Sequence, residues 1–271
     1  MKSVLITGNK GFIGSYIETS LQGKYTTLGF NRENGFDLTD FNTFQKPERT
    51  IDTIIHTAAI ASNDYEASFN SNVTGTLNIC KYAKKHGIKR IILLSSIFAL
   101  DEKDNGYFNS YGQTKKLSEE LASAYCKEHQ IELTILRLAQ VYDDARLAIK
   151  GQAMLYYFVD TINNEGKITL FGKKNPLRNY IHIDYLCHVV NEIMAEQKIG
   201  IWNVTEEQNH TIAEIAYMLF DIVNKQPNIS RLSDKAVIPS VHIPQQDIYE
   251  SKNISPISLY EGLKRILNYE Q

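Results

Sequence analysis

The hydrophobic pattern of the first half of the chain alternates short apolar runs with amphipathic stretches. Five runs rich in apolar and β-branched residues are predicted to form strands: 4–7, 25–30, 51–57, 90–94 and 131–138. Between them, apolar residues recur every three or four positions in three predicted helices: 12–21, 70–86 and 111–129. This alternation is typical of a parallel sheet with helices on both faces. We therefore expect an α/β fold, a Rossmann-type doubly wound parallel sheet.

The pattern is less regular after residue 150. It predicts helices over 152–164, 183–197, 211–224 and 258–268, strands over 167–171 and 201–204, and a loop over 172–181. Four of the six prolines lie in the last 45 residues, which indicates a loop-rich C-terminal part. We expect a dinucleotide-binding domain of 1–165 plus about 182–205, a smaller substrate-binding lobe of about 166–181 plus 206–271, and an active site between them.

A glycine-rich turn joins the first predicted strand to the first predicted helix. The sequence T-G-N-K-G-F-I-G over 7–14 places its glycines three residues apart. Residues without a side chain let a diphosphate approach the backbone, and the free N–H groups at the start of the helix face it. The spacing differs from the more common G-x-G-x-x-G, but the position between strand and helix is the one a dinucleotide site requires. The predicted contacts are Gly8, Gly11, Phe12, Ile13 and Gly14.

A tyrosine and a lysine four residues apart open the third predicted helix. Tyr111 and Lys115 therefore lie on one face of that helix. Ser96 follows the fourth predicted strand, and an open parallel sheet presents its ligand site at the carboxyl ends of its strands. Because a nearby ammonium group favours the phenolate, we expect Lys115 to lower the pKa of Tyr111. The three residues predict hydride-transfer chemistry, in which Tyr111 exchanges a proton with the substrate oxygen and Ser96 orients that oxygen. Tyr111 and Lys115 are also predicted to contact the cofactor, Lys115 through the ribose hydroxyls.

Two neighbouring patterns are weaker candidates. Ser95 stands beside Ser96, and the spacing of Tyr111 and Lys115 recurs at Tyr260 and Lys264. No strand-end serine precedes the second pair, so we expect it to be an exposed helical pair.

Further motifs follow the glycine turn in the order found in one protein family: D-L-T-D at 37–40, H-T-A-A at 56–59, N-V-T-G-T at 72–76, R-N-Y-I-H-I-D at 178–184 and S-P-I-S-L-Y-E-G-L at 255–263. The chain thus resembles the extended short-chain dehydrogenases/reductases, the epimerase/dehydratase and reductase group that acts on nucleotide sugars. The resemblance implies that Asp37 and Leu38 contact the adenine, and that Ala58 and Ala59 lie along the cofactor ribose and diphosphate. It also implies a homodimer formed through the helices at 70–86 and 111–129.

The residues after the serine pair narrow the reaction that this resemblance implies. The family's 4,6-dehydratases carry Asp and Glu directly after the catalytic hydroxyl residue, and its fucose-forming epimerase-reductases carry Cys there. This chain has Ile97 and Phe98. Elimination of water and double epimerisation are therefore disfavoured. Plain hydride transfer remains, as in a ketosugar reductase, a sugar dehydrogenase or a 4-epimerase.

The end of the second predicted strand bears on the cofactor. An NAD site usually offers an acidic residue to the ribose hydroxyls, whereas an arginine suits the 2′-phosphate of NADP. Asn31 and Arg32 occupy this place and the first acid is Glu33, so NADP is favoured, with NAD as the alternative. The leading expectation is NADPH-dependent reduction of a 4-keto-6-deoxy nucleotide sugar. The alternatives are an NAD-dependent nucleotide-sugar 4-epimerase and, from another class, a non-catalytic cofactor-sensing protein.

Two residues of the second half are predicted to bind the substrate. An arginine fork suits phosphate oxygens, so Arg178 is assigned to the nucleotide diphosphate, with a loop–loop salt bridge as the alternative. Gln140 stands where many members of the family have an Asn near the sugar. Because the residue differs, the hexose contact that the resemblance implies here is in doubt. His182 lies between two isoleucines and is expected to be structural.

Composition excludes several classes of function. The formal net charge of −2 and the scattered lysines argue against nucleic acid as a partner. Three widely spaced cysteines predict reduced thiols, and the histidine spacing predicts no metal site. No apolar run approaches the roughly 20 residues that cross a bilayer, and the N-terminus does not resemble a signal peptide, so we expect a cytoplasmic protein without a membrane partner.

Overall fold

Six parallel strands form one sheet in the order β10-β5-β4-β3-β1-β2 in the computed structural model, which describes residues 1–62, 64–100, 109–235, 239–241 and 246–269. The strands are β1 (Ser3–Thr7), β2 (Thr26–Phe30), β3 (Thr53–His56), β4 (Arg90–Ser96), β5 (Glu132–Leu138) and β10 (Gly200–Val204). Every pairing between neighbours is parallel. The expected α/β, Rossmann-type fold is confirmed.

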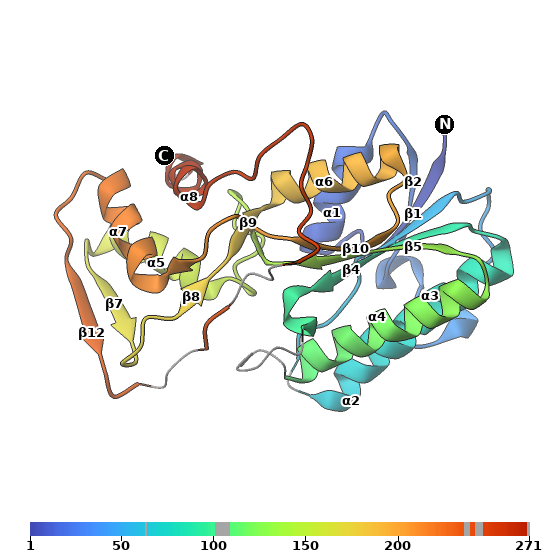
Figure 1. Cartoon of the computed structure of the whole chain (residues 1–271), viewed down its shortest axis with the longest axis horizontal. Helices are drawn as coiled ribbons and strands as arrows, with labels where there is room; N and C mark the ends of the chain where they lie inside the picture. Colours follow the sequence, from blue (N-terminus) through green and yellow to red (C-terminus); the bar gives the residue numbers. More distant parts are fainter. Residues whose placement is uncertain (63, 101–108, 236–238, 242–245, 270–271) are drawn as a thin grey trace.

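Helices cover both faces of this sheet (Figure 1). One face carries α1 (Phe12–Leu21) and α6 (Ile183–Glu196), and the other carries α3 (Gly75–His86) and α4 (Ser110–Glu128). Successive strand residues point to opposite faces, so Ile92 packs in the core under α1 and α6 while Ile91 packs under α3 and α4. Burial on both faces explains why these strands are almost continuously apolar.

The helix expected over 70–86 is not regular. It is divided into α2 (Tyr65–Ser68), a π-helical segment η3 (Phe69–Thr74) and α3. Widened turns of this kind are frequent at functional sites. Asn72 lies in the π-helical segment, where its side chain bonds to the loop after β3.

The C-terminal part forms a lobe beside the carboxyl ends of the sheet strands (Figure 1). Its core contains α5 (Ala153–Asn164), α7 (Ile212–Ile222), α8 (Leu259–Tyr269) and β7 (Ile168–Phe171), which pairs with β12 (Ile229–Leu232). The expected domain division at 165 would assign α5 to the dinucleotide-binding domain. The apolar side chains of α5 pack instead with α7 and α8.

The loop expected over 172–181 contains two short strands, so that expectation is wrong in part. β8 (Leu177–Arg178) pairs with β11 (His210–Thr211), and β9 (Tyr180–His182) pairs with β6 (Gln140–Tyr142). Strands of two or three residues show no periodicity, and their hydrogen-bond partners are distant in sequence. These pairings bring Gln140 and Arg178 to the side of the lobe that faces the sheet. No helix of the described residues is long and apolar enough to cross a membrane.

Candidate active site and dinucleotide cleft

The glycine turn brings three chain segments closer together than side chains would permit. Gly8 has a φ of +68°, and a Cβ on Gly14 would lie 2.2 Å from the Gly8 carbonyl oxygen. α1 begins directly after Gly11, with no side chain capping its first N–H groups and no acidic residue in its first turn. Free N–H groups and the positive end of the helix dipole suit a diphosphate, so these residues fit the expected dinucleotide.

Gly14→Ala is expected to weaken dinucleotide binding at least about ten-fold, because the added Cβ forces backbone, rather than a flexible side chain, to move. Titration of protein fluorescence with NADH measures this. Gly151→Ala is the matched control, because its Cβ would meet only an ordinary 3.7 Å contact with the Ala148 carbonyl oxygen. Equal dissociation constants for the two variants would contradict the assignment of the turn.

A cleft of about 480 Å³ extends from this turn along the end of β2. The residues predicted from the sequence to bind the cofactor line it, apart from Tyr111 and Lys115: Gly8, Gly11, Phe12, Ile13, Gly14, Asn31, Arg32, Asp37, Leu38, Ala58 and Ala59. The sequence reasoning missed Lys10 and Ser71, which line the same cleft. The Thr39 N–H and hydroxyl donate to Asp37 and hold the pKa of its carboxyl below the usual range.

Asn31 acts as a cap in this cleft. Its Oδ1 accepts a hydrogen bond from the Asn34 N–H at 3.2 Å, and its Nδ2 donates to Asn9 Oδ1 at 2.8 Å. These bonds fix the 3₁₀ turn Arg32–Asn34 at the end of β2. The Asn31 side chain therefore positions Arg32 and Glu33 at the edge of the cleft. Its own Oδ1 already accepts the hydrogen bond from Asn34.

A second cleft of about 860 Å³ lies between the sheet and the lobe. It is lined by all five residues that the sequence assigned to catalysis and substrate: Ser96, Tyr111, Lys115, Gln140 and Arg178. Both clefts share four lining residues, so they are continuous: Phe12, Ile13, Thr57 and Ala59.

Local structure explains how Ser96 and Tyr111 meet. β4 ends at Ser96, whose Oγ accepts a hydrogen bond from the Phe98 N–H at 3.2 Å. α4 begins one residue before Tyr111, and Asn109 caps it by accepting from the Tyr111 N–H at 3.1 Å. Ser96 and Tyr111 line the same cleft, near enough that the Ser96 hydroxyl partly opposes the shift in the pKa of Tyr111. Ser95 differs, because its hydroxyl donates to the buried carboxylate of Glu119.

The electrostatics of the pair differ from the expectation. Burial raises the pKa of Tyr111 to about 12, and the Ser96 hydrogen bond only partly opposes this. The Lys115 ammonium donates to the Leu94 carbonyl oxygen at 2.6 Å, and burial lowers its pKa to about 8. In this arrangement burial dominates the pKa of Tyr111, and Lys115 does not contribute to its shift because its ammonium group is bonded to Leu94.

Lys115→Met is expected to stabilise the fold by about 1–3 kcal/mol at pH 7, because an apolar side chain replaces a buried cation. The native pKa of about 8 lies below the ordinary 10.5, so charging the buried lysine costs stability most fully below pH 8. This cost disappears as the pH rises from 8 to 10.5. Urea unfolding at pH 7 and pH 10 tests this, and a variant less stable than wild type at pH 7 would contradict it.

The two predicted substrate residues have partners within the protein. The Arg178 guanidinium is buried and donates to the carbonyl oxygens of Leu177 at 2.6 Å and Pro239 at 2.8 Å. Arg178 therefore bonds main-chain carbonyl oxygens, and it also lines the cleft. Gln140 donates from Nε2 to Gln152 Oε1 at 3.1 Å.

Charge in this second cleft is of one sign. Lys115, Lys150 and Arg178 line it, and none of its lining residues within the described part of the chain is acidic. A cleft lined by cations raises the local concentration of anions. The site therefore suits an anionic substrate.

Two histidines serve the structure. His182 is buried, bonds Asp144 Oδ1 at 3.0 Å and accepts from the Asp184 N–H at the start of α6, as expected for a packed residue. His56 bonds the hydroxyls of Thr7 at 2.7 Å and Thr76 at 3.2 Å. Burial, with a smaller effect of Lys115, lowers the pKa of His56 to about 3, so it is neutral.

Two buried polar residues that the sequence reasoning missed support the site. Asn72 accepts from the Ile60 N–H at 2.9 Å and donates to the Thr114 hydroxyl at 3.0 Å, which ties the loop after β3 to α4. Asp143 follows β6 and is fully buried. Asn72 opens the N-V-T-G-T motif, but the motif gave it no role, and the only signal for Asp143 was a polar residue after an apolar run.

Comparisons with known proteins agree with this geometry. A sequence profile of the NAD-dependent epimerase/dehydratase family matches residues 4–205. A putative UDP-glucose 4-epimerase of Methanocaldococcus jannaschii is 26% identical over 98% of this chain and 97% of the relative. The UDP-glucose 4-epimerase of Thermus thermophilus in complex with NAD superposes with a TM-score of 0.77, at 21% identity over 98% of each chain. RMD from Pseudomonas aeruginosa complexed with NADPH gives 0.82, at 16% identity over 99% of this chain and 98% of the other.

Proposed function

Because the chain belongs to the NAD-dependent epimerase/dehydratase family, we propose that it is an NAD-dependent 4-epimerase of a UDP-linked sugar. The named relatives support this alternative better than the NADPH-dependent reduction that the sequence favoured. The observation that carries the proposal is that Ser96 and Tyr111 line one cleft together with cationic side chains. The two residues after Ser96, Ile97 and Phe98, are apolar and offer no acid–base group for elimination of water. Hydride transfer is thus the chemistry for which the residues are present, and intact Ser96, Tyr111 and Lys115 argue against a non-catalytic sensor.

The chain's own residues perform the proton steps. Tyr111 takes the proton from the sugar hydroxyl and returns it later, while Ser96 holds the reacting oxygen by a hydrogen bond. The raised pKa of Tyr111 must fall for this step. A Lys115 ammonium released from the Leu94 carbonyl oxygen would supply the needed positive charge. Bound in the adjoining cleft, the nicotinamide cofactor supplies the hydride acceptor and donor.

Inversion at a sugar carbon requires the ketone to present its other face before hydride returns. The cleft has the room for such a turn, since its volume is about 860 Å³ and small residues form much of its wall: Ala59, Ala61, Ala139, Ala148, Gly151 and Ala153. Lys150 and Arg178 stand in the same cleft and are suited to hold the diphosphate while the sugar moves.

The test is incubation with UDP-glucose, UDP-N-acetylglucosamine and UDP-glucuronate, each with catalytic NAD, followed by chromatography of the nucleotide sugars. The proposal predicts conversion of one substrate to its 4-epimer without net consumption of cofactor. Stoichiometric loss of NADPH with a 4-keto nucleotide sugar, and no epimer from any UDP-sugar, would establish the reductase instead.

The edge of the cofactor cleft favours a second candidate, the NADPH-dependent ketosugar reductase. Lys10 and Arg32 both line that edge, and the capping residue Asn31 stands where an acidic ribose ligand would. Two cations there suit a 2′-phosphate. Glu33 lines the same edge and would suit the ribose of NAD.

Arg32→Ala is expected to weaken NADPH binding about 10- to 100-fold, because hydrogen bonds to charged groups contribute about 1.5–3 kcal/mol. NADH binding is expected to change less than about two-fold, since NADH lacks the 2′-phosphate. Calorimetric titration of wild type and variant with both cofactors measures this. An unchanged NADPH affinity would remove the support for the reductase.

We also propose a homodimer formed through α3 and α4 with the segment before them. Three large apolar side chains on that side are exposed: Tyr65 by 57%, Phe69 by 47% and Leu117 by 43%. They line one shallow hollow on α2, η3 and α4. Exposed apolar clusters of this kind mark protein interfaces. Size-exclusion chromatography with light scattering should give twice the chain mass, and Leu117→Glu should give the monomer.

A further inference from the structure

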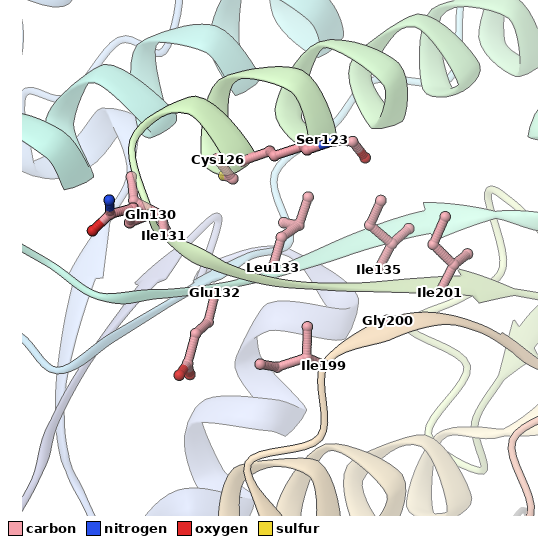
Figure 2. Close-up of a pocket in the computed structure, with 11 residues that line it drawn as sticks. Ser123, Cys126, Gln130, Ile131, Glu132, Leu133, Ile135, Ile199, Gly200 and Ile201 are labelled. Atoms are coloured by element: carbon pink, nitrogen blue, oxygen red, sulfur yellow. The ribbon is translucent and has the colours of Figure 1, made fainter.

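A group of three polar side chains lies beside the proposed catalytic residues and takes no part in the proton steps. Alternate residues of β4 and β5 point toward α4, and Figure 2 shows Leu133 and Ile135 of β5 standing on that face of the sheet. The next residue of β5 on this face is Arg137, and its register partner on β4 is Ser95. The apolar face under α4 therefore ends in polar residues at the carboxyl ends of the strands, where Ser95 lines the substrate cleft.

Glu119 of α4 bonds to both of these residues. Its carboxylate accepts hydrogen bonds from the Ser95 hydroxyl and from Arg137, whose Nε lies at 3.0 Å and Nη2 at 2.6 Å from Oε2. Glu119 is buried, with 3% of its surface exposed. Because apolar residues in place of a buried ion pair are often neutral or stabilising, stability alone does not account for these polar groups.

Glu119 lies on the same face of α4 as the proposed catalytic residues. Tyr111, Lys115 and Glu119 follow one another at intervals of four residues. One turn before Glu119, the Lys115 ammonium donates to the Leu94 carbonyl oxygen at 2.6 Å. Two successive turns of α4 are thus bonded to the end of β4, directly before Ser96.

We propose that Glu119, held by Arg137, is a positioning residue that fixes α4 against the ends of β4 and β5, so that Tyr111 and Ser96 meet in the substrate cleft. This role rests on the proposed function, in which Tyr111 and Ser96 act on the sugar. Glu119 lines neither cleft and acts through the helix. A displacement of a reacting group by about 1 Å can cost about 10²-fold in rate, so loss of this anchor should appear in turnover.

The test replaces both members of the ion pair, because removing one alone leaves a buried charge without a partner. Glu119→Leu/Arg137→Met should melt at a temperature no lower than that of wild type. Its turnover number with the accepted UDP-sugar, counted per bound NADH, should nevertheless fall about 10- to 100-fold. KM and the dissociation constant for NADH should change less than about three-fold. Wild-type turnover in this variant would overturn the proposal.

Hydrogen exchange measures the same anchor without turnover. In the double variant, the amide groups in the first two turns of α4 should exchange faster than in wild type, whereas those of α6 on the other face of the sheet should not. Unchanged exchange in α4 would also overturn the proposal. If wild type converts no UDP-sugar, the proposed function fails, and the exchange still decides whether Glu119 anchors α4.

A single variant separates the charge of Glu119 from its packing. The ionisable neighbours of Lys115 in the described part of the chain are Tyr111 and Glu119 on α4, His56 on β3 and, bonded to Glu119, Arg137 on β5. Among them only the Lys115 ammonium has a pKa near 8, which burial lowers and Glu119 raises. Glu119→Gln should therefore lower this pKa further, and turnover should be lost at a lower pH than in wild type, since the ammonium form assists the proton step.

Glu120→Gln is the matched control. It makes the same change one residue further along α4, on an exposed side chain. Its turnover number and pH profile should match those of wild type. A pH profile of Glu119→Gln that coincides with that of Glu120→Gln would contradict the role of the carboxylate. If Glu119→Gln fails to fold, turnover and hydrogen exchange of the double variant decide the question.

Discussion

Tyr111→Phe is expected to lower the turnover number about 10²- to 10⁴-fold, the usual contribution of a positioned acid–base group. The change removes only a hydroxyl in the substrate cleft, and Tyr111 does not line the dinucleotide cleft, so the fold and that cleft stay intact. The dissociation constant for NADH should therefore change less than about three-fold. Steady-state kinetics with the accepted UDP-sugar, together with NADH titration, separate the two effects.

The chain contains its own control for this variant. Tyr260 and Lys264 have the spacing of Tyr111 and Lys115, but the Tyr260 hydroxyl donates to Asp221 Oδ2 at 2.7 Å on α7. Tyr260→Phe should leave turnover within about two-fold of wild type, as is usual for changes away from the reacting groups. Equal losses in the two variants would mean that Tyr111 acts through stability and has no part in the chemistry.

Asp143→Ala is expected to lower the free energy of unfolding by about 3–5 kcal/mol, because several buried donors lose their acceptor at once. Asp143 Oδ1 accepts from the Ala148 N–H at 3.0 Å and the Tyr156 hydroxyl at 2.9 Å. Its Oδ2 accepts from the Leu147 N–H and the Tyr16 hydroxyl, both at 3.1 Å. Burial, reinforced by Asp143, raises the pKa of Tyr16. The carboxylate therefore ties α1 to the loop that enters the substrate cleft.

Urea unfolding measures this effect, and KM for the sugar should also rise because that loop carries Lys150 and Gln152 into the cleft. Asp144→Ala is the control, since the side chain of Asp144 is 28% exposed and bonds His182. Asp144→Ala should lower the free energy of unfolding by about 1 kcal/mol. A loss at Asp143 no larger than at Asp144 would contradict the proposed tie.

Regular elements could be predicted where the signal is local. The sheet strands and the long helices show their period within a few residues, and their bounds were predicted to within one or two positions for β1, β10 and α4. The short strands could not be predicted, because two or three residues show no period and each partner lies far away in sequence. They are β6, β8, β9 and β11. The π-helical segment was also missed, and Asn72, which lies in it, bonds to residues that are distant in sequence.

In the candidate active site, too, only the features encoded by local sequence could be predicted. Ser96 and Tyr111 could be placed together because the end of β4 and the start of α4 are both visible in the sequence. The direction of the Tyr111 pKa shift could not, because burial depends on the packed lobe. Asn31 lines the cofactor cleft, but its role as a cap could not be predicted, since its hydrogen bond to Asn9 appears only when β2 lies beside β1.

The most direct test of the proposed epimerisation follows deuterium at the reacting carbon. The protein is incubated with UDP-glucose, UDP-N-acetylglucosamine and UDP-glucuronate, each deuterated at C4, and the nucleotide sugars are analysed by mass spectrometry and NMR. Hydride transfer and return within one site predicts that one of them gives its 4-epimer with the deuterium kept at C4 and no net change in cofactor. Loss of the deuterium to solvent, net consumption of cofactor, or no conversion at all would contradict the account.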